Sequence, residues 1–422
     1  MSEASAARGA GPDQPSGQVV ARGDLRGQEL VLTSVKHLLS HQMPSGALLA
    51  SRDFLPYQFC WLRDGSFVAF ALDLAGERRA AESFHRWVSR SVLRSAPLMR
   101  AATERRDAGG TNIAASMPPA RFTLDGDVTQ DGWPNFQVDG YGTWLWSLLE
   151  HVKRWHAHEL AEGMGEAVGL VSAYLQAVAL DTCFDCWEEN GDALHTSTLA
   201  CTYGGLRAAS ALVGSSASSQ AAGRRADDVQ GLIAERAVLG GRFVKSSNDA
   251  GVDASLLWLA VPFGAAGPSS PAMTATAQAI EETLDLDGGT RRYQGDTYYG
   301  GGAWPLLTAW LGWYRAVTGD MAAAHRCEKW VEACFDTSGQ LPEQLGGAQR
   351  DPASYSDWVG KWGPPAADLA WSHAMFLVLQ DQLDEEAAPR SEGPSGTPQR
   401  NRQTNPTFLD SRGTSVTGQE RG

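Results

Sequence analysis

The stretch RYQGDTYYGGGAWPLLTAWLGWYRAVTGDMAAAHRCEKWVEACF, residues 292–335, contains the structural unit that repeats along this chain and decides its fold. It opens with a loop, 292–300, that is rich in Tyr, Gly, Arg and Asp. In 303–317 apolar residues recur at intervals of three and four, which predicts a helix with one buried face. Gly319 favours a helix end, and a second helix is predicted at 320–335. The first helix carries the apolar stripe Leu306, Leu307, Trp310, Leu311 and Tyr314.

The same periodicity recurs in segment after segment and predicts about twelve helices. Alternating patterns typical of strands are scarce, and only 121–129 could form a short hairpin. The fold class is therefore predicted to be all-α. The helices are expected near residues 26–41, 64–75, 78–93, 140–155, 162–179, 195–213, 224–238, 253–260, 272–284, 303–317, 320–335 and 368–383.

Loops rich in aromatic and charged residues precede every second predicted helix. In a chain of alternating antiparallel helices, every second connection lies at the same end. Six helix pairs closed into a ring would therefore place all six rich loops on one rim, where they would form a cleft. The loops are 57–64, 132–142, 187–189, 249–253, 292–300 and 341–373.

The composition excludes some partners. The chain has 422 residues, of which 43% are hydrophobic and 20% charged, so it can form a substantial core. Its formal net charge of −14 disfavours nucleic acid and anionic membrane surfaces, and it is compatible with a neutral substrate such as a sugar. No stretch of about 18 uncharged apolar residues occurs, so no membrane span is expected. The oligomeric state stays open, with a monomer favoured.

Polar segments at both ends suggest the domain limits. Residues 1–20 and 387–422 are dominated by Ser, Gly, Pro, Gln, Arg and Thr, so we expect two disordered tails around one helical domain, 21–386, the barrel. The first 17 residues contain no apolar segment of the kind found in secretion signals. A cytoplasmic protein is therefore expected.

The six cysteines do not form a disulfide framework. Cys183 and Cys186 make a single C-x-x-C motif without a second pair, so a structural role is expected in place of zinc binding. Cys327 and Cys334 lie on one predicted helix face and are expected to be buried thiols.

Two glutamates about 155 residues apart, Glu188 and Glu343, indicate the chemistry. Hydrolysis of a glycosidic bond needs two carboxyl groups on opposite sides: one protonates the leaving oxygen and the other activates water or attacks the sugar. Trp187 precedes Glu188, and a neighbouring indole desolvates a carboxylate, which suits a proton donor. From the residues alone, Glu188 and Glu189 cannot be told apart, and a solvated acidic pair is an alternative for both.

Other charged residues in the loops have two interpretations. Arg63 and Asp64 open a predicted helix, so Asp64 could cap it, or the pair could grip two hydroxyls of one sugar ring. Arg292, among four glycines and three tyrosines, could hold a sugar hydroxyl or steady the carboxylates. His373 is expected to be a packed, hydrogen-bonded side chain. Motifs of serine hydrolases, dehydrogenases, kinases and zinc enzymes are missing from the sequence, so neither a metal nor an organic cofactor is expected.

The loops, in this order, resemble those of glycoside hydrolase family 15, which includes glucoamylases, glucodextranases and some bacterial trehalases. The resemblance runs from about Gly46 to Phe376. The matching stretches are Tyr57-x-Phe59-x-Trp61-x-Arg63-Asp64, Trp187-Glu188-Glu189, Arg292-Tyr293-x-x-Asp296-x-Tyr298-Tyr299, Leu341-Pro342-Glu343-Gln344 and Asp368-Leu369-x-Trp371-Ser372-His373.

The resemblance implies an (α/α)6 barrel and a set of roles. Glu188 would be the general acid and Glu343 the general base, with their carboxyl groups about 6.5–9.5 Å apart to admit a water. Glu189 would lie beside the first sugar, whose 4- and 6-hydroxyls Arg63 and Asp64 would hold. The implied substrate-binding residues are Tyr57, near the developing positive charge, Trp61, Arg63, Asp64, Trp133, Trp187, Glu189, Arg292 and Trp371, beneath the catalytic floor.

The resemblance also implies an exo-acting hydrolase that inverts the anomeric carbon and releases β-glucose. One loop departs from the family pattern, since four residues separate Pro134 from Asp139, and this leaves the linkage preference open. No N-terminal β-sandwich or starch-binding domain is recognised, which favours short oligosaccharides with α-1,6 linkages such as isomaltose. The alternatives are an α-1,4 glucoamylase or trehalase, a phosphorylase on the same barrel, and a non-catalytic sugar-sensing barrel.

Overall fold

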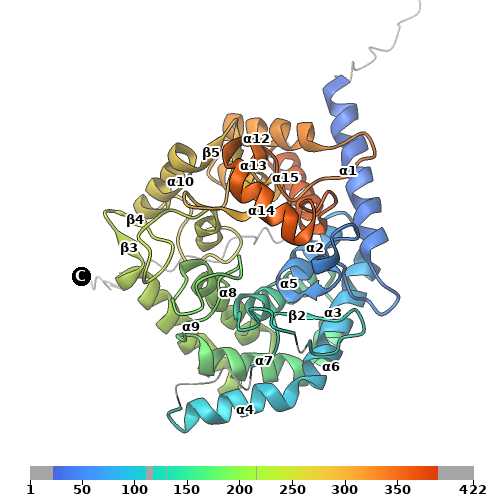
Figure 1. Ribbon diagram of the computed structural model, residues 1–422. Coiled ribbons are helices and arrows are strands. Elements are labelled where there is room, and N and C mark those ends of the chain that lie inside the picture. Colours follow the sequence, from blue (N-terminus) through green and yellow to red (C-terminus); the bar gives the residue numbers. More distant parts are fainter. Residues whose placement is uncertain (1–21, 111–116, 130, 215, 388–422) are drawn as a thin grey trace, which may run out of the picture.

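The computed structural model describes residues 22–110, 117–129, 131–214 and 216–387 (Figure 1). The predicted tails, 1–20 and 387–422, lie outside these ranges except for Ala387. In the described part of the chain, no helix is long and apolar enough to cross a membrane.

Six elements form an inner ring (Figure 1). Each contacts the next one along the chain, and the last contacts the first, so the ring is closed. Five are α-helices and one is a 3₁₀ helix. They are α2 (Leu62–Leu74), α5 (Asp139–Trp155), α8 (Thr196–Leu212), η3 (Ala254–Leu259), α11 (Pro305–Val317) and α15 (Ala370–Ala387).

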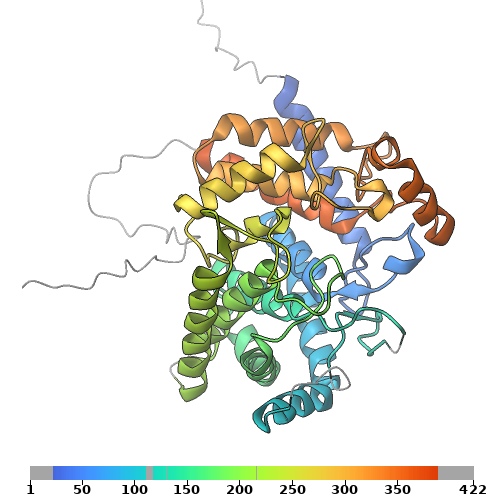
Figure 2. The ribbon, with the colours of Figure 1, turned by 60° about the vertical axis from the view of Figure 1, so that its left-hand side comes forward.

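Six further helices alternate with the inner elements in the sequence and pack outside them. This alternation confirms the predicted all-α ring of six helix pairs. Figure 2 shows α1 running beside the last helices of the described chain, where α1 contacts α15. The outer helices are α1 (Arg22–His41), α3 (Arg78–Arg94), α7 (Gly165–Val178), α9 (Ala217–Arg236), α10 (Pro271–Leu284) and α12 (Met321–Cys334).

Four helices were not predicted: α4 (Ala96–Asp107), α6 (His158–Gly163), α13 (Gly347–Arg350) and α14 (Pro352–Trp362). α6 and α13 are only 6 and 4 residues long, α14 has no fully buried residue, and α4 buries only Ala96, Met99 and Ala102. The helix expected at 253–260 is the short 3₁₀ helix η3.

Only two-residue strands occur in the described ranges. β1 (Cys60–Trp61) pairs with β2 (Arg121–Phe122), β3 (Val238–Leu239) with β4 (Arg242–Phe243), and β5 (Asp285–Leu286) with β6 (Gly289–Thr290). The short hairpin expected at 121–129 is present as a tight turn: Phe122 and Val128 form an antiparallel bridge, and the Thr123 amide donates to the Asp127 carbonyl at 3.0 Å.

The centre of the ring is filled with aromatic side chains. Phe67 is fully buried, and its ring centroid lies 4.7 Å from that of Trp310 and 5.7 Å from that of Trp371. Trp258 stacks on Trp310 at 5.0 Å. Burying such large apolar surfaces is the main driving force for closing the ring.

Close packing of two inner helices depends on glycine. A Cβ atom on Gly205 of α8 would lie 2.4 Å from the Cα atom of Gly142 of α5. Any side chain at this crossing would therefore force α5 and α8 apart.

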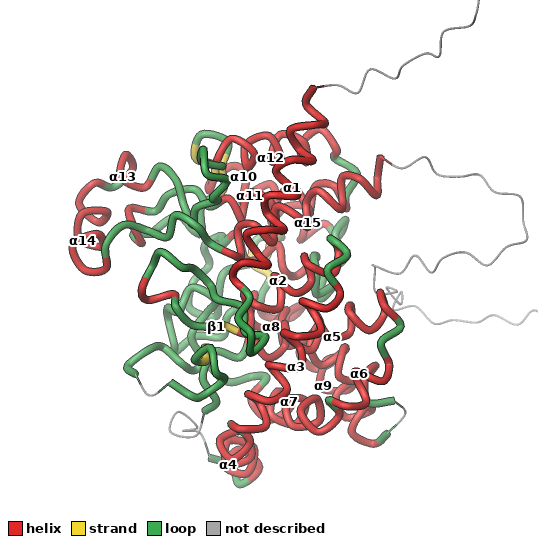
Figure 3. Tube along the Cα trace, turned by 90° about the vertical axis from the view of Figure 1, so that its right-hand side faces the viewer, coloured by secondary structure: helices red, strands yellow, loops and turns green. Residues whose placement is uncertain are grey.

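The loops that precede the inner elements gather on one side of the ring. Figure 3 shows these loops, together with α13 and α14, on the side opposite the bulk of the helices. The predicted rim is therefore present, and it holds the site described next.

Candidate active site

The rim loops enclose a cavity of about 360 Å³. Five of the six predicted rich loops contribute to its wall. All eleven residues predicted for the site line it: Tyr57, Trp61, Arg63, Asp64, Trp133, Trp187, Glu188, Glu189, Arg292, Glu343 and Trp371.

The sixth loop, 249–253, supports the wall from behind. Both carboxylate oxygens of Asp253 accept from Trp187 Nε1, at 3.2 and 3.0 Å. The Lys245 ammonium lies 3.3 Å from Asp253 Oδ2. Among the described residues, this loop therefore acts on the cavity through Trp187 and adds no wall residue of its own.

A tight turn presents Glu188. Asp185 Oδ1 accepts from the backbone amides of Trp187 and Glu189, both at 2.9 Å, and the Asp185 carbonyl accepts from the amide of Glu188. Glu188 itself has a φ of +68°, which is uncommon for a residue with a side chain. Strained backbone of this kind concentrates at functional sites. Burial raises the pKa of Asp185 to about 7 despite the nearby Lys245.

Two neutral N–H groups fix the Glu188 carboxyl group. Its Oε1 atom accepts from Trp61 Nε1 at 2.7 Å and from Gln137 Nε2 at 3.1 Å. The nearest indole N–H is thus that of Trp61, since Trp187 donates to Asp253. Gln137 was not predicted, and it also accepts from Arg63 Nη1 at 2.9 Å, so it links the acid candidate to the arginine.

Glu343 lies in a more enclosed place. It is 1% exposed, and its Oε1 atom accepts from the Tyr57 hydroxyl at 2.7 Å. Among the described residues, its Oε2 atom has no hydrogen-bond partner. Burial raises the pKa of Glu343 to about 7, while the Tyr57 hydrogen bond acts in the opposite direction.

Tyr298, which was not predicted for the site, holds the Tyr57 side chain. The two hydroxyl oxygens are 2.9 Å apart. Burial holds the pKa of Tyr57 well above its usual value, so its hydroxyl keeps the proton that it donates to Glu343.

Glu189 differs from Glu188 in its partners. Its Oε1 atom lies 3.3 Å from Arg292 Nη2, and its Oε2 atom accepts from the Tyr293 hydroxyl at 2.5 Å. Arg292 is held in turn by two hydrogen bonds to Asp296. A carboxylate paired with a guanidinium is poorly suited to give up a proton. The two neighbouring glutamates therefore differ in their partners: Glu189 contacts Arg292 and Tyr293, whereas Glu188 contacts Trp61 and Gln137.

Arg63 and Asp64 lie in the wall as an ion pair, with Arg63 Nε 3.2 Å from Asp64 Oδ2. Arg63 Nη1 also donates to Asp139 Oδ2 at 2.9 Å. Burial raises the pKa of Asp64 to about 6 despite the arginine beside it. The capping interpretation of Asp64 is wrong, because α2 begins at Leu62 without a side-chain cap.

Aromatic side chains form the floor and one side. Trp371 stacks on the buried Phe67, and the Arg63 guanidinium lies 5.4 Å from the centroid of the Trp371 ring. Arg121, which was not predicted, lies 3.6 Å from the ring centroid of Trp133 and 5.1 Å from that of Trp61. These contacts join loops that are distant in sequence.

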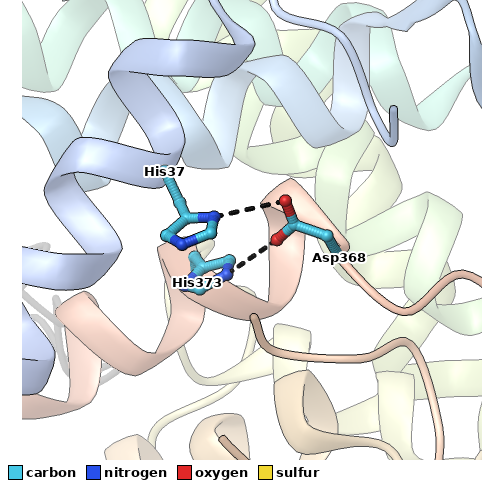
Figure 4. A group of neighbouring side chains, drawn as sticks. All are labelled: His37, Asp368 and His373. Atoms are coloured by element: carbon cyan, nitrogen blue, oxygen red, sulfur yellow. Dashed lines mark hydrogen bonds and ion pairs between the residues drawn. The ribbon is translucent and has the colours of Figure 1, made fainter. Parts of the chain in front are cut away.

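A cluster of His37, Asp368 and His373 secures the loop that carries Glu343 (Figure 4). His37 Nδ1 lies 3.2 Å from Asp368 Oδ2, and His373 Nε2 lies 3.0 Å from Oδ1. The two rings are nearly parallel, with centroids 4.8 Å apart, so their nitrogens face different oxygens of one carboxylate. His373 is thus a packed, hydrogen-bonded residue, as predicted.

Backbone contacts connect this cluster to Glu343. His373 Nε2 lies 3.2 Å from the amide nitrogen of Leu341, and the Glu343 amide donates to the Ala366 carbonyl at 2.9 Å. The Ser372 hydroxyl donates to the Pro342 carbonyl at 2.9 Å. The position of the Glu343 carboxyl group therefore depends on the start of α15.

Comparison with known proteins agrees with this site. The family model for glycosyl hydrolases family 15 matches residues 26–340. The chain belongs to glycoside hydrolase family 15. It is a glycoside hydrolase. The matched range includes Glu188 and ends just before Glu343, which the structure brings to the same cavity.

Two relatives of this family 15 chain are informative. Isomaltose glucohydrolase of Kribbella flavida is 38% identical over 358 residues, which cover 84% of this chain and 92% of the relative. An uncharacterized glycosyl hydrolase of Methanocaldococcus jannaschii is 28% identical over 368 residues, which cover 82% of this chain and 54% of that protein.

Solved structures share the family 15 barrel. A wild-type glycosidase is 37% identical, with a TM-score of 0.82, and the match covers 86% of this chain and 99% of the glycosidase. A variant of a glycosidase was solved in complex with glucose and matches equally well. The glucoamylase of Saccharomycopsis fibuligera, 15% identical with a TM-score of 0.67, shares the fold.

Proposed function

We propose that this chain is an exo-acting, inverting α-glucosidase that releases β-glucose from the non-reducing end of isomaltose and short α-1,6-linked oligosaccharides. The observation that carries the proposal is that Glu188 and Glu343 line one cavity with different surroundings. Inversion requires an acid and a base on opposite faces of one sugar ring.

Glu188 acts as the general acid. The N–H groups of Trp61 and Gln137 both reach its Oε1 atom, so the orientation of the carboxyl group is fixed while its other oxygen is left for the substrate. In the reaction it gives its proton to the glycosidic oxygen as the bond to the anomeric carbon breaks. Assistance of this kind is typically worth about 10²–10⁴-fold in rate.

Glu343 acts as the general base. Tyr57 occupies its Oε1 atom, so Oε2 is the atom that takes a proton from the attacking water. A pKa of about 7 suits a base that works near neutral pH, because proton transfer is most effective when the pKa is close to the working pH.

The charged groups of the wall bind the glucose unit at the non-reducing end, which is released as β-glucose. Arg63 and Asp64 on one side, and Glu189 with Arg292 on the other, present donors and acceptors to a ring of hydroxyl groups. Trp371 lines the cavity and packs on the fully buried Phe67, so the aromatic core behind it leaves no passage through the ring. A pocket of this kind favours attack at the end of a chain.

The α-1,6 preference rests on the relative from Kribbella flavida, which is named for isomaltose and covers most of this chain. A panel of isomaltose, maltose, nigerose, kojibiose and trehalose, with released glucose measured, tests it. Isomaltose is expected to give the highest kcat/KM. Faster cleavage of maltose or trehalose would assign the enzyme to the glucoamylase or trehalase specificity instead.

Two variants test the roles of the glutamates. α-Glucosyl fluoride has a leaving group that needs little protonation. Glu188→Gln should therefore lower the rate of isomaltose hydrolysis about 10²–10⁴-fold and the rate of fluoride hydrolysis far less. Glu343→Gln should lose activity on both substrates, because both need activated water. NMR of the first-formed product should show β-glucose. Equal losses on both substrates for Glu188→Gln would remove it from the acid role.

A further inference from the structure

Helix α14 lies on the loop side of the ring, where it contacts the 3₁₀ helix η4 (Tyr298–Gly300) (Figure 3). At its start, Asp351 Oδ1 accepts from the Ser354 amide at 3.1 Å, and Oδ2 accepts from the Ser354 hydroxyl at 2.7 Å. Just past its end, the Gly363 carbonyl accepts from the Tyr299 hydroxyl at 2.8 Å. The cap stabilises the first turn, and the contacts with η4 place the helix although none of its side chains is fully buried.

One face of α14 points into the catalytic cavity. Trp358, Lys361 and Trp362 all line it. Residues separated by three and four positions share a helix face, so the three side chains form one surface. The Lys361 ammonium lies 5.4 Å from the Trp358 ring and 5.3 Å from the Trp362 ring.

Trp358 anchors this surface to the base side of the site. Its ring lies 4.9 Å from Tyr298, whose hydroxyl meets that of Tyr57. Trp362, by contrast, is 44% exposed. Within the described ranges it is the one aromatic residue among the large apolar side chains that are exposed. The surface thus runs from the catalytic residues to solvent.

We propose that Trp358, Lys361 and Trp362 form the platform that binds the leaving sugar, the glucose unit on the reducing side of the cleaved bond. This inference rests on the proposed glycosidase function. Trp362 lines the cavity and is 44% exposed, so it lies where a sugar unit that follows the cleaved glucose would leave the enclosed part of the site. An indole face suits the C–H face of a pyranose, and the Lys361 ammonium can donate to its hydroxyls.

The platform also limits the useful length of the substrate. Beyond Trp362, which is 44% exposed, a third sugar unit would extend toward solvent. A substitution in the platform should therefore lower kcat/KM on isomaltose and on isomaltotriose by the same factor.

The test compares substrates with and without a leaving sugar. For Trp362→Ala, the ratio of kcat/KM on isomaltose to kcat/KM on α-glucosyl fluoride should fall about tenfold, which corresponds to about 1.4 kcal/mol. Asp357→Ala is the matched control, because Asp357 is exposed on the same helix and is not part of the cavity wall. Its ratio should equal that of the wild type.

The outcomes are distinguishable. A wild-type ratio in Trp362→Ala, with activity on both substrates, would overturn the platform and leave the glycosidase function standing. A wild-type enzyme that cleaves neither substrate would overturn the proposed function itself. Thermal unfolding of both variants checks that neither substitution in α14 has changed the stability of the protein.

Discussion

The hydroxyl group of Tyr57 donates to Glu343 Oε1 over 2.7 Å and thereby joins the loop before α2 to the loop before α15. These loops are at opposite ends of the described chain, and they meet because α15 contacts α2. The hydrogen bond favours the ionised form of a buried carboxyl group, so it sets the pH range in which Glu343 can accept a proton.

Replacing Tyr57 with Phe should move the acidic limb of the pH–activity profile upward. A base works when it is deprotonated, so kcat/KM should rise as the pH passes through about 7, the pKa of Glu343. Without the Tyr57 donor that pKa increases further, and the limb should shift to higher pH. The measurement is kcat/KM on isomaltose between pH 4 and pH 9. A limb that stays in place or moves down would contradict this account of Tyr57.

Replacing Glu343 with Gln should stabilise the protein at alkaline pH. Burial raises the pKa of Glu343 in the folded state from 4.5 to about 7, so the folded protein favours the neutral carboxyl group. Stability is therefore lost as the pH rises from about 4.5 to 7, and a neutral amide avoids this loss. The expected gain at pH 8 is about 3 kcal/mol, with little difference at pH 4.

Calorimetric unfolding at both pH values measures this effect. Glu235→Gln, at an exposed position on α9, is the matched control and should show no such pH-dependent gain. If Glu343→Gln were no more stable than the wild type at pH 8, ionisation of the buried Glu343 carboxyl group would not destabilise the folded protein.

Replacing Asp368 with Asn should lower kcat more than it changes KM. Asn keeps one acceptor oxygen and puts an NH2 donor in place of the other, so it cannot accept from both His37 and His373 as the carboxylate can. The segment from Leu341 to Glu343 is then held less firmly, and a small misplacement of a catalytic group can cost about 10²-fold in rate. Steady-state kinetics on isomaltose, well below the unfolding temperature, give the two constants. A reduced unfolding temperature with unchanged kcat would restrict the cluster to stability.

Replacing Gly205 with Ala should destabilise the ring by about 2 kcal/mol through the crossing of α5 and α8, because overpacking of a filled core costs this much. Gly231→Ala is the matched control. Gly231 lies within α9, where a Cβ would meet nothing within 4 Å, and alanine should stabilise that helix by about 0.5–1 kcal/mol. Urea unfolding measures both. Equal effects of the two substitutions would refute the close-packing argument.

The ring of helix pairs was predictable because each inner helix buries an apolar stripe and follows a loop with a distinct composition. The residues Glu188 and Glu343 were predictable for the same reason, since each lies in such a loop. The roles of these two glutamates remain predictions until variants are measured.

Other parts could not be found from the sequence. The sequence of helix α14 shows no periodic pattern of apolar residues, because the helix buries no side chain fully. Three further residues of the site matter because of partners distant in the sequence. Gln137 contacts Glu188, 51 residues away, and Tyr298 contacts Tyr57, 241 residues away. Arg121 contacts Trp133, 12 residues away. No local pattern reports contacts of this kind.

Closure of the ring by α15 has a consequence for biosynthesis. The acid candidate is translated near the middle of the chain, whereas the base candidate and the helix that positions it come almost last. Domains emerge from the ribosome with the N-terminal part first. The nascent polypeptide consequently cannot assemble its sugar pocket until α15 has left the exit tunnel and docked between α11 and α2.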